Sequence, residues 1–380
     1  MAVGFVKAVE GRTTLLVPEL SLTAKVPPKT PAFFNPAARL NRDLSMLAYR
    51  AIALSLPAKT FADSFAGVGA RALRVATEIP EIEQVYGNDI NSIAIEAAKE
   101  AAGLNSVSEK CHFSIDEVCK FLLHGDAEGE RFGIVDLDPF GTPARHIDCV
   151  LRAVLDGGLV SITATDTAVL CGVYPEVCVR RYYGRPLNND YGNEVALRLL
   201  LSLLALTASR LELAIRPVFV HATMHYLRVY ATVSVSSSEA NDVYSNIGYI
   251  MHCFNCGHRF ASKEYDGKSK CELCKTGLRV GGQLWTGPFH DKEFVKKMLA
   301  QNPDTRCKKV LDASLEEISE VPYYFKADEI SSKLKTNPHS VQKIIEKLQS
   351  AGFAASRTPL NTSAFKTDAK ITQILDVLRK

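Results

Sequence analysis

The feature that most constrains the fold is an alternation of short apolar strands with helical segments, which runs from residue 42 to about residue 235. Strands separated by helices of this length form a mainly parallel sheet with helices packed on its faces. We therefore predict an α/β fold for this part of the chain. The expected strands cover residues 60–65, 84–89, 111–115, 132–138 and 158–165, and the expected helices cover residues 42–56, 71–78, 92–102, 117–123 and 144–155.

The alternation ends at a polar stretch, residues 236–241, which we interpret as a linker between two domains. Residues 1–250 hold 23 Lys and Arg against 27 Asp and Glu (net −4), and residues 251–380 hold 22 against 15 (net +7). A basic part attached to a mildly acidic one favours an appendage that binds a polyanion, although a solvated basic surface has the same composition. We predict a first domain over 1–235, with an N-terminal arm over 1–41, and a smaller C-terminal α+β domain over 236–380.

The sequence predicts neither a membrane span nor a secretory signal. The most apolar stretch, residues 196–213, contains Arg198, Arg210 and Glu212, whereas a span needs about 20 nearly uncharged residues. The first residues lack the basic and then apolar order of a signal peptide. We expect a cytoplasmic protein that does not bind membranes, and no obligate protein partner is evident.

A glycine-rich turn follows the first expected strand and precedes a helix. Gly67, Gly69 and Ala72 satisfy the loose dinucleotide-binding pattern, and Asp89 closes the next strand near the distance expected for a ribose contact. S-adenosylmethionine would use the same groups, because glycines let the backbone approach either ligand and a strand-end carboxylate accepts hydrogen bonds from ribose hydroxyls. The turn alone therefore leaves a dehydrogenase and a methyltransferase open.

The acidic residue just before this turn distinguishes the two ligands. Asp63 would repel a pyrophosphate bound at the helix N-terminus, but it suits S-adenosylmethionine, which has no phosphate and carries ammonium and sulfonium groups. Asp116, after the third expected strand, is placed to accept a hydrogen bond from the adenine amino group. We predict that Asp63, Gly67, Asp89 and Asp116 bind S-adenosylmethionine; helix capping alone is the alternative for each acid.

The fourth expected strand ends in Asp138-Pro139-Phe140-Gly141, which resembles the (Asp/Asn)-Pro-Pro-(Tyr/Phe) signature of methyltransferases that act on amino groups of bases. An exocyclic base amine is a poor nucleophile because its lone pair is delocalised into the ring. The Asp138 carboxylate and the Pro139 carbonyl can accept its two N–H bonds and offset the positive charge that grows on the nitrogen. Proline removes a competing donor, and Phe140 can stack on an extruded base.

We therefore predict Asp138, Pro139 and Phe140 as catalytic residues. Asp136 shares a pleat face with Asp138, and we interpret it as structural or facing the cofactor. The alternative for the whole segment is an ordinary turn after a strand.

With these motifs, the chain resembles the tRNA guanine-26 N2-dimethyltransferase family, archaeal and eukaryotic enzymes that convert a guanosine to its N2,N2-dimethyl form. The resemblance covers nearly the whole chain, and the Asp-Pro-Phe-Gly turn has the family's form with a single proline. Further segments in the family's order are Phe34-Asn35-Pro36, Asn41-Arg42-Asp43, residues 163–167, Cys171-Gly172, Asn193-Glu194, Arg198 and residues 282–288.

The resemblance implies a Rossmann-like class I S-adenosylmethionine methyltransferase domain with tRNA as its partner. The implied reaction is mono- and dimethylation of the exocyclic N2 of guanosine 26. Phe33 or Phe34 would line the base or cofactor pocket, or would simply anchor the N-terminal arm. Arg42 and Arg71 would pair with the methionine carboxylate of the cofactor. The cofactor contacts that the resemblance implies are Arg42, Arg71, Asp89, Asp116 and Glu117.

Four cysteines in the C-terminal part predict a structural zinc site. Cys253 and Cys256 form one Cys-x-x-Cys pair, and Cys271 and Cys274 form a second pair after fourteen residues. Paired knuckles place four thiolates at tetrahedral Zn²⁺ spacing, and four cysteines close the site to substrate; a redox dithiol is the alternative. We interpret six other cysteines as mostly small buried residues: Cys111, Cys119, Cys149, Cys171, Cys178 and Cys307.

The end of the chain, residues 322–380, predicts a winged-helix-like module that binds tRNA. Two short amphipathic helices are expected over 327–334 and 340–348, followed by polar segments around residues 356–366. In the first domain, residues 180–185 form a basic and aromatic cluster that can hold RNA backbone and bases; a plain surface loop is the alternative.

Other functions remain to be weighed against a tRNA N2-guanine methyltransferase. One is an amino-directed methyltransferase of ribosomal RNA or DNA, which the resemblance over the whole chain disfavours. Another is a zinc-ribbon and winged-helix nucleic-acid-binding protein with an inactive front domain, which the intact Asp138-Pro139-Phe140 segment disfavours. A nucleotide dehydrogenase is disfavoured by Asp63.

Overall fold

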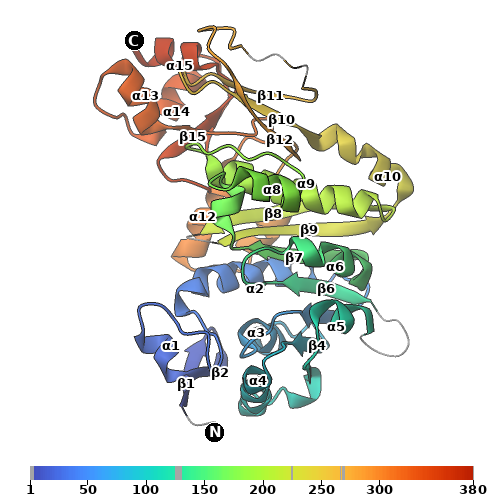
Figure 1. Ribbon diagram of the computed structural model, residues 1–380. Helices are drawn as coiled ribbons and strands as arrows, with labels where there is room; N and C mark the ends of the chain where they lie inside the picture. Colours follow the sequence, from blue (N-terminus) through green and yellow to red (C-terminus); the bar gives the residue numbers. More distant parts are fainter. Residues whose placement is uncertain (1–3, 125–130, 224–225, 266, 268–269, 380) are drawn as a thin grey trace. The chain divides into compact units, whose positions relative to one another are not determined.

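A computed structural model of the chain describes residues 4–124, 131–223, 226–265, 267 and 270–379 (Figure 1). The chain divides into two units that interleave along the sequence. The first holds residues 1–164, 230–235 and 297–307, and the second holds residues 165–229, 236–296 and 308–380. The domain boundary placed between residues 235 and 236 from the sequence stays a prediction, and each unit is described by itself below.

The main sheet has seven strands in the order β5-β4-β3-β6-β7-β9-β8. Each pair of neighbours from β5 to β7 is parallel. The predicted α/β fold with a mainly parallel sheet is therefore confirmed. The strands are β3 (Thr60–Asp63), β4 (Gln84–Asn88), β5 (Cys111–Ser114), β6 (Phe132–Leu137), β7 (Val154–Ala164), β8 (Leu213–Thr223) and β9 (Tyr226–Val235).

The helices of the first unit follow the predicted order, with shifts at their ends. The helix expected at 42–56 begins earlier, because Asn35 caps the 3-10 turn Pro36–Ala38 that leads into it. The helix expected at 144–155 is a 3-10 turn, Ala144–His146, followed by a short α-helix, since Val154 already takes an extended conformation. These helices are α2 (Arg39–Ala53), α3 (Ala70–Glu78), α4 (Ser92–Leu104), α5 (Val118–His124) and α6 (Ile147–Ala153).

The N-terminal arm forms an antiparallel hairpin, β1 (Phe5–Glu10) and β2 (Thr13–Pro18), followed by the short helix α1 (Glu19–Thr23). Apolar side chains of β2 and the alanine-rich face of α4 belong to one buried cluster. Asn105, just after α4, also accepts from the backbone N–H of Thr14 at 2.9 Å. The arm is therefore packed on the sheet domain.

In the second unit, the stretch expected as a linker is helical. Ser236 caps the short helix α10 (Ser237–Asn241) by accepting a hydrogen bond from the N–H of Glu239, and a 3-10 turn, Asp242–Asn246, follows. The segment is helical because Ser236 and Glu239 have the spacing of a capping box, and its role as a linker between two domains stays a prediction. The other elements between residues 165 and 320 are α7 (Thr167–Leu170), α8 (Pro175–Tyr182), α9 (Gly192–Ser209), β10 (Ile247–His252), β11 (Arg259–Ser262), β12 (Arg279–Trp285), α11 (Lys292–Leu299) and α12 (Thr305–Glu316).

The end of the chain carries the elements expected for it. The first expected helix is α13 (Ala327–Leu334) and the second is α14 (Val341–Ser350), and an antiparallel pair, β14 (Ala355–Arg357) and β15 (Ala364–Thr367), follows. A short strand, β13 (Phe325–Lys326), pairs with β15, and α15 (Ile371–Arg379) ends the module. One buried apolar cluster joins all three helices to these strands.

Helix α9 is the one helix in the described part of the chain that is long and apolar enough to cross a membrane, but 78% of that window is buried within the chain. It also carries a buried ionic network. Arg198 donates to Glu194 at 2.6 Å and to the carbonyls of Trp285 and Gly287 at 2.8 and 3.0 Å. Lys366, itself 1% exposed, donates to Glu194 at 2.8 Å. These contacts identify α9 as a core helix of the second unit.

Replacing Glu194 by alanine should lower the free energy of unfolding by about 3–5 kcal/mol, because two buried cations would lose a shared carboxylate. Chemical denaturation of purified protein measures this change. Lys370→Ala is the control, since Lys370 and its partner Glu272 are 60% and 57% exposed and such a pair contributes at most about 1 kcal/mol. Equal, small effects of the two substitutions would contradict a stabilising role for the network.

Candidate active site

The carboxyl ends of β3, β4, β5 and β6 meet at one edge of the sheet. Asp63 in β3 lies in register with Gly87 in β4 on one side and with Asp136 in β6 on the other. Asn88 in β4 lies in register with Ser114 in β5. Loops at this edge of an open parallel sheet are where ligands bind. The residues predicted for the cofactor and for catalysis follow these four neighbouring strands.

The glycine-rich turn after β3 is held by the acid at the end of β4. Gly67 and Gly69 have φ angles of +53° and +75°, in the left-handed region that favours glycine. One oxygen of Asp89 accepts from the N–H of Gly67 at 2.9 Å, and the other accepts from the N–H of Asn91 at 2.9 Å. A side chain at Gly69 would place its Cβ 2.9 Å from the Cβ of Ala98. The turn therefore has a preformed shape that depends on its glycines.

Three carboxylates gather around Arg71 at this edge. Its Nη1 donates to Asp138 at 2.7 Å and lies 3.4 Å from Asp136, and its Nη2 donates to Asn41 at 3.2 Å. The hydroxyl of Tyr49 also donates to Asp136. Arg71 and Asp136 are buried, while the Asp138 side chain is 21% exposed. One cation thus stabilises the charged form of Asp138 at the opening of the site.

The third carboxylate, Asp63, is 1% exposed, and its Oδ1 has no hydrogen-bond partner among the described residues. Burial, together with the negative charges of Asp136 and Asp138, raises the pKa of Asp63 to about 8, against the opposing effect of Arg71. Asp63 therefore holds a proton at neutral pH until a positive charge comes near it. An unpaired buried carboxyl oxygen beside a glycine turn fits a cationic ligand.

Asp116 and Glu117 lie between β5 and α5. Asn88 orients this loop, because its Oδ1 accepts from the N–H of Asp116 at 3.0 Å. The Asp116 carboxylate, 33% exposed, pairs with Lys120 at 2.5 Å. Glu117 accepts from the N–H groups of Cys119 and Lys120, so it caps α5. Helix capping was weighed from the sequence for Asp116 and not for Glu117, yet in this structure Glu117 is the residue that caps α5.

The turn after β6 presents an aromatic ring to solvent. Phe140 is 61% exposed, and its ring centroid lies 4.8 Å from that of Phe33 in an edge-to-face arrangement. The Lys29 ammonium lies 4.9 Å from the same ring centroid. Pro139 is buried beneath the turn. The two aromatic rings, next to a partly exposed carboxylate, form a platform on which a base can stack.

Arg42 takes part in a different contact from the one predicted. Its Nε and Nη2 make a two-pronged pair with Glu10, each at 2.6 Å, and Nη2 also donates to the carbonyl of Asn35 at 3.1 Å. Arg42 is 6% exposed, and its guanidinium lies over the ring of Phe34. In this structure Arg42 ties the N-terminal arm to α2, and Phe34 anchors the arm.

Cys119 and Cys149, interpreted from the sequence as small buried residues, form a disulfide with a Cα–Cα distance of 5.4 Å. It joins α5, which follows the Asp116 loop, to α6, which follows the Asp138 turn. The Nδ1 of His146 lies 3.8 Å from the sulfur of Cys119. Thirty residues separate the two cysteines, and no spacing motif marks the pair, so the sequence pattern could not predict it.

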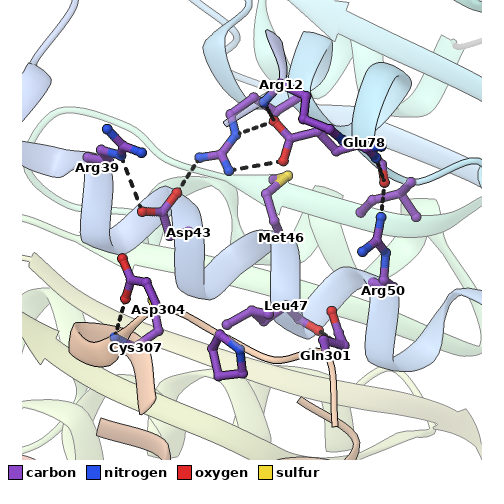
Figure 2. A pocket seen from close by; sticks show the side chains of 13 residues that line it. Arg12, Arg39, Asp43, Met46, Leu47, Arg50, Glu78, Gln301, Asp304 and Cys307 are labelled. Atoms are coloured by element: carbon purple, nitrogen blue, oxygen red, sulfur yellow. Dashed lines mark hydrogen bonds and ion pairs between the residues drawn. The ribbon is translucent and has the colours of Figure 1, made fainter. Parts of the chain in front are cut away.

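A cavity of about 420 Å³ elsewhere in the first unit is lined by four arginines, two of which pair with carboxylates (Figure 2). Arg74 pairs with Asp43 at 2.7 Å and with Glu78 at 2.9 Å, and Arg39 pairs with Asp43 at 3.5 Å. None of the residues predicted for the site lines this cavity. We therefore interpret it as part of the scaffold.

The four cysteines predicted to bind zinc are brought together in the second unit. Their sulfur atoms all lie within 4.8 Å of one another, with Cys253 and Cys274 at 3.4 Å and Cys256 and Cys271 at 3.6 Å. Tetrahedral zinc with bonds of about 2.3 Å places its sulfur ligands about 3.8 Å apart. The donor set and the distances therefore fit Zn²⁺.

The two cysteine pairs have the same backbone turn. Gly257 and Lys275, each just after a pair, have φ angles of +80° and +61° and donate their N–H groups to the carbonyls of Cys253 and Cys271. The two neighbouring histidines contact other groups, since the ring of His252 lies 3.1 Å from the hydroxyl of Tyr191 and His258 lies 3.3 Å from Glu272. Neither histidine belongs to the cysteine cluster.

Three polar residues of the site were not predicted from the sequence. Tyr49, Asn41 and Asn88 hold Asp136, Arg71 and the Asp116 loop respectively. Asn41 was noticed only as part of a family-like segment. Tyr49 lies in the middle of α2 and Asn88 at the end of β4, where nothing in the local pattern separates them from ordinary helix and strand residues.

The position of these groups at the carboxyl edge of a parallel sheet defines the class of protein. A buried acid at the end of the first strand disfavours a pyrophosphate ligand, and the Asp-Pro-Phe-Gly turn lies one strand away. The class is a Rossmann-like methyltransferase. Within it, the chain belongs to the family described as N2,N2-dimethylguanosine tRNA methyltransferase, whose profile matches residues 11–379.

Individual relatives agree with this assignment. The tRNA (guanine(26)-N(2))-dimethyltransferase of Methanothermobacter thermautotrophicus is 34% identical over 379 residues, covering 97% of each chain. The tRNA (guanine(26)-N(2)/guanine(27)-N(2))-dimethyltransferase of Aquifex aeolicus is 33% identical over 376 residues, covering 96% of this chain and 94% of the relative. The structure of Trm1 from Pyrococcus horikoshii with S-adenosyl-L-methionine matches with a TM-score of 0.83 at 26% identity, covering 98% and 99%. The predicted family, fold class and enzyme class are confirmed.

Proposed function

We propose that this protein transfers methyl groups from S-adenosylmethionine to the exocyclic N2 of guanosine 26 in tRNA, first one and then a second. The observation that carries the proposal is the Asp138-Pro139-Phe140 turn, which lies one strand away from the buried Asp63 and the glycine turn. The relatives named above support tRNA as the substrate. A tRNA substrate also supports the expected cytoplasmic location.

On the cofactor side, S-adenosylmethionine supplies an electrophilic methyl group. Gly67 and Gly69 let the backbone approach it closely. Asp89 accepts hydrogen bonds from ribose hydroxyls, because each carboxylate oxygen retains a lone pair after its one backbone contact. Asp63 offers its unpaired oxygen to the positive charge of the ligand. Asp116 and the adjoining Glu117 face the adenine.

Arg42 and Arg71 remain the proposed partners of the methionine carboxylate, and each is already paired with an acid of the chain. Arg71 reaches Asp138 and Asp136, so we propose that it also holds Asp138 charged. Arg42 is held by Glu10, so we propose that it acts mainly as a positioning residue for the arm that carries Phe33 and Phe34.

On the substrate side, the guanine stacks on Phe140 beside Phe33, after leaving its place in the tRNA. The Asp138 carboxylate and the Pro139 carbonyl accept the two N–H bonds of N2, which directs its lone pair toward the methyl group. As the N–C bond forms and the sulfur–carbon bond breaks, the proton lost from N2 passes to an oxygen of Asp138. Arg71 pairs with this carboxylate at 2.7 Å.

Cys253, Cys256, Cys271 and Cys274 would hold a structural Zn²⁺ in the second unit. The four thiolates leave no position for a substrate, so the ion would fix the two turns against each other. The module would then present the neighbouring surface of the second unit to tRNA.

The pKa of Asp63 predicts how cofactor binding depends on pH. Because Asp63 is protonated below about pH 8 and the cationic cofactor favours its charged form, binding should release about one proton at pH 7. Affinity should then rise about tenfold per pH unit up to pH 8 and level off above it. Calorimetry in two buffers of different ionisation enthalpy counts the released protons.

Asp63→Asn is the matched control, because it keeps the side-chain shape and cannot titrate. The amino group of the free cofactor titrates equally in both experiments, so the difference between the two proteins reports Asp63 and its contact with the bound cofactor. The same proton release in wild type and Asp63→Asn would contradict this role.

The choice of guanosine is tested with two altered tRNA transcripts. Methyl transfer should be lost when guanosine 26 is replaced by adenosine and retained when guanosine 27 is replaced. The Aquifex relative is named for both positions, so residual transfer to the first transcript would show that this chain also accepts guanosine 27.

A further inference from the structure

The second unit contains a cavity of about 920 Å³ in which aromatic and basic side chains face the same space. Its wall comes from the segment after α8, from β10, from the first cysteine turn and from β12. The described lining includes no acidic residue. The residues used below are Arg185, Tyr249, Phe254, Tyr265, Arg279 and Gly282.

The aromatic residues of this cavity are unusually exposed. Phe254 and Tyr265 are 50% and 49% exposed, and the ring of Tyr265 lies 6.1 Å from that of Tyr249. The guanidinium of Arg279 lies 5.7 Å from the ring centroid of Phe254. Adjacent exposed aromatic rings mark a binding surface more often than isolated ones.

The charge of the cavity is unbalanced. Arg185 and Arg279 are both exposed. Across the described residues, neither guanidinium has an ion pair with a carboxylate. Elsewhere in the same unit, exposed arginines such as Arg216 do have one, with Asp291 at 2.6 Å. Two arginines that have no ion pair within the described residues, beside aromatic rings, complement a ligand that combines a phosphate with a flat base.

The backbone around the cavity is fixed before any ligand binds. Arg185 and Gly282 exchange two backbone hydrogen bonds, at 2.7 and 2.8 Å, which fasten the loop after α8 to β12. On the other side of this loop, a Cβ at Gly172 would lie 2.8 Å from the backbone nitrogen of Asn188. A preformed wall loses little entropy on binding.

We propose that this cavity binds an unpaired nucleotide of the tRNA, with its base against Phe254 and Tyr265 and its phosphates at Arg185 and Arg279. The choice of tRNA as the ligand rests on the proposed function. The cavity adds a second site of contact with tRNA, besides the target guanosine. Unpaired nucleotides fit better than duplex, because proteins read double-stranded RNA by shape and read unpaired bases by stacking.

The test measures the dissociation constant for an unmodified tRNA transcript and the rate of its methylation, using the full-length protein. Phe254→Leu keeps an apolar side chain and removes the stacking ring, so it should raise the Kd for tRNA roughly five- to hundredfold, the range for losing one base stack. Phe254→Trp keeps an aromatic ring, so it should bind tRNA like wild type. Arg279→Ala should lower the slope of log Kd against log salt by about 1.

Tyr244→Ala and Arg216→Ala are the controls, because Tyr244 is 64% exposed in the same unit and Arg216 is paired with Asp291. Both should leave tRNA binding unchanged. A short oligouridine should displace tRNA from wild type more strongly than from Phe254→Leu, whereas a duplex of equal length should not discriminate between them.

The two proposals fail in different ways. A wild-type protein that methylates tRNA, with Phe254→Leu and Arg279→Ala both binding like wild type, would overturn the cavity proposal alone. A wild-type protein that binds tRNA through the cavity and transfers no methyl group would overturn the proposed function alone. Because Phe254 lies between two zinc-binding cysteines, an equal zinc content in all Phe254 variants confirms that the turn is intact.

Discussion

Replacing Asp138 by alanine should lower kcat for methyl transfer roughly 10²- to 10³-fold, the loss typical of one group that stabilises charge in a transition state. Asp138 lies at the opening of the site with its carboxylate held charged by Arg71 at 2.7 Å. In the proposed function it acts on the step in which N2 gains positive charge, and not on the cofactor contacts around Asp89. Cofactor affinity should therefore stay close to that of wild type, as measured by calorimetry.

Two further variants make this prediction specific. Asp138→Asn keeps the side-chain shape and one acceptor oxygen. If hydrogen bonding dominates, it should retain more activity than Asp138→Ala. If proton removal dominates, its activity should be as low as that of Asp138→Ala. Asp148→Ala is the matched control, because its carboxylate pairs with Arg152 on the exposed side of α6 and is 42% exposed. Near-normal turnover of Asp138→Ala would contradict the role assigned to this residue.

Replacing Cys271 by serine should reduce the zinc content from about one ion per chain to near zero, with loss of the folded cysteine module. Cys271 is fully buried, and its sulfur lies 3.6 Å from that of Cys256. A structural zinc site contributes on the order of 10 kcal/mol to folding at neutral pH, so three remaining thiolates bind the ion far less tightly. Elemental analysis and thermal unfolding measure the two effects.

The control for this substitution is Cys171→Ser. Cys171 is half-buried in the same unit and contacts Asn193 at 3.8 Å, outside the cysteine cluster. Its replacement should leave the zinc content unchanged. Wild-type protein purified without chelators and found to contain no zinc would contradict the metal site, whatever the variants do.

Much of the first unit could be predicted, because its secondary structure depends on residues that are close together in the sequence. Strand and helix periodicity placed the elements between residues 60 and 164 to within a few residues, and the carboxyl ends of parallel strands necessarily share one edge. Asp63, Asp89 and Asp116 were therefore assigned to one ligand without knowledge of their contacts. The cluster of four cysteines was predicted in the same way, from spacing alone.

Several contacts that the sequence did not predict join segments far apart in the chain. Glu10 reaches Arg42 across 32 positions, and Tyr49 reaches Asp136 across 87. Each partner is an ordinary residue in its own segment. Only the folding of α2 beside β1 and β6 brings the members of each pair together. For the same reason, the pairing of Arg42 with Glu10 could not be foreseen from the arginine alone.

Several family-like segments in the second half of the chain proved to be parts of one buried network. Glu194 and Arg198 lie on α9, and Arg198 donates to carbonyls of Trp285 and Gly287 in the segment 282–288. Two buried cations and their shared carboxylate must be satisfied together. Their role is to hold the second unit, so a resemblance over such segments indicates the fold more directly than the chemistry.

The most direct test of the central claim is to identify the methylated atom. Unmodified tRNA transcript is incubated with the protein and S-adenosylmethionine bearing a labelled methyl group, and the nucleosides are separated and fragmented in a mass spectrometer. We expect labelled N2-methylguanosine first and labelled N2,N2-dimethylguanosine later. Label on a ring nitrogen, on a ribose oxygen or on another base would contradict the assignment of Asp138 and Pro139 to an exocyclic amine.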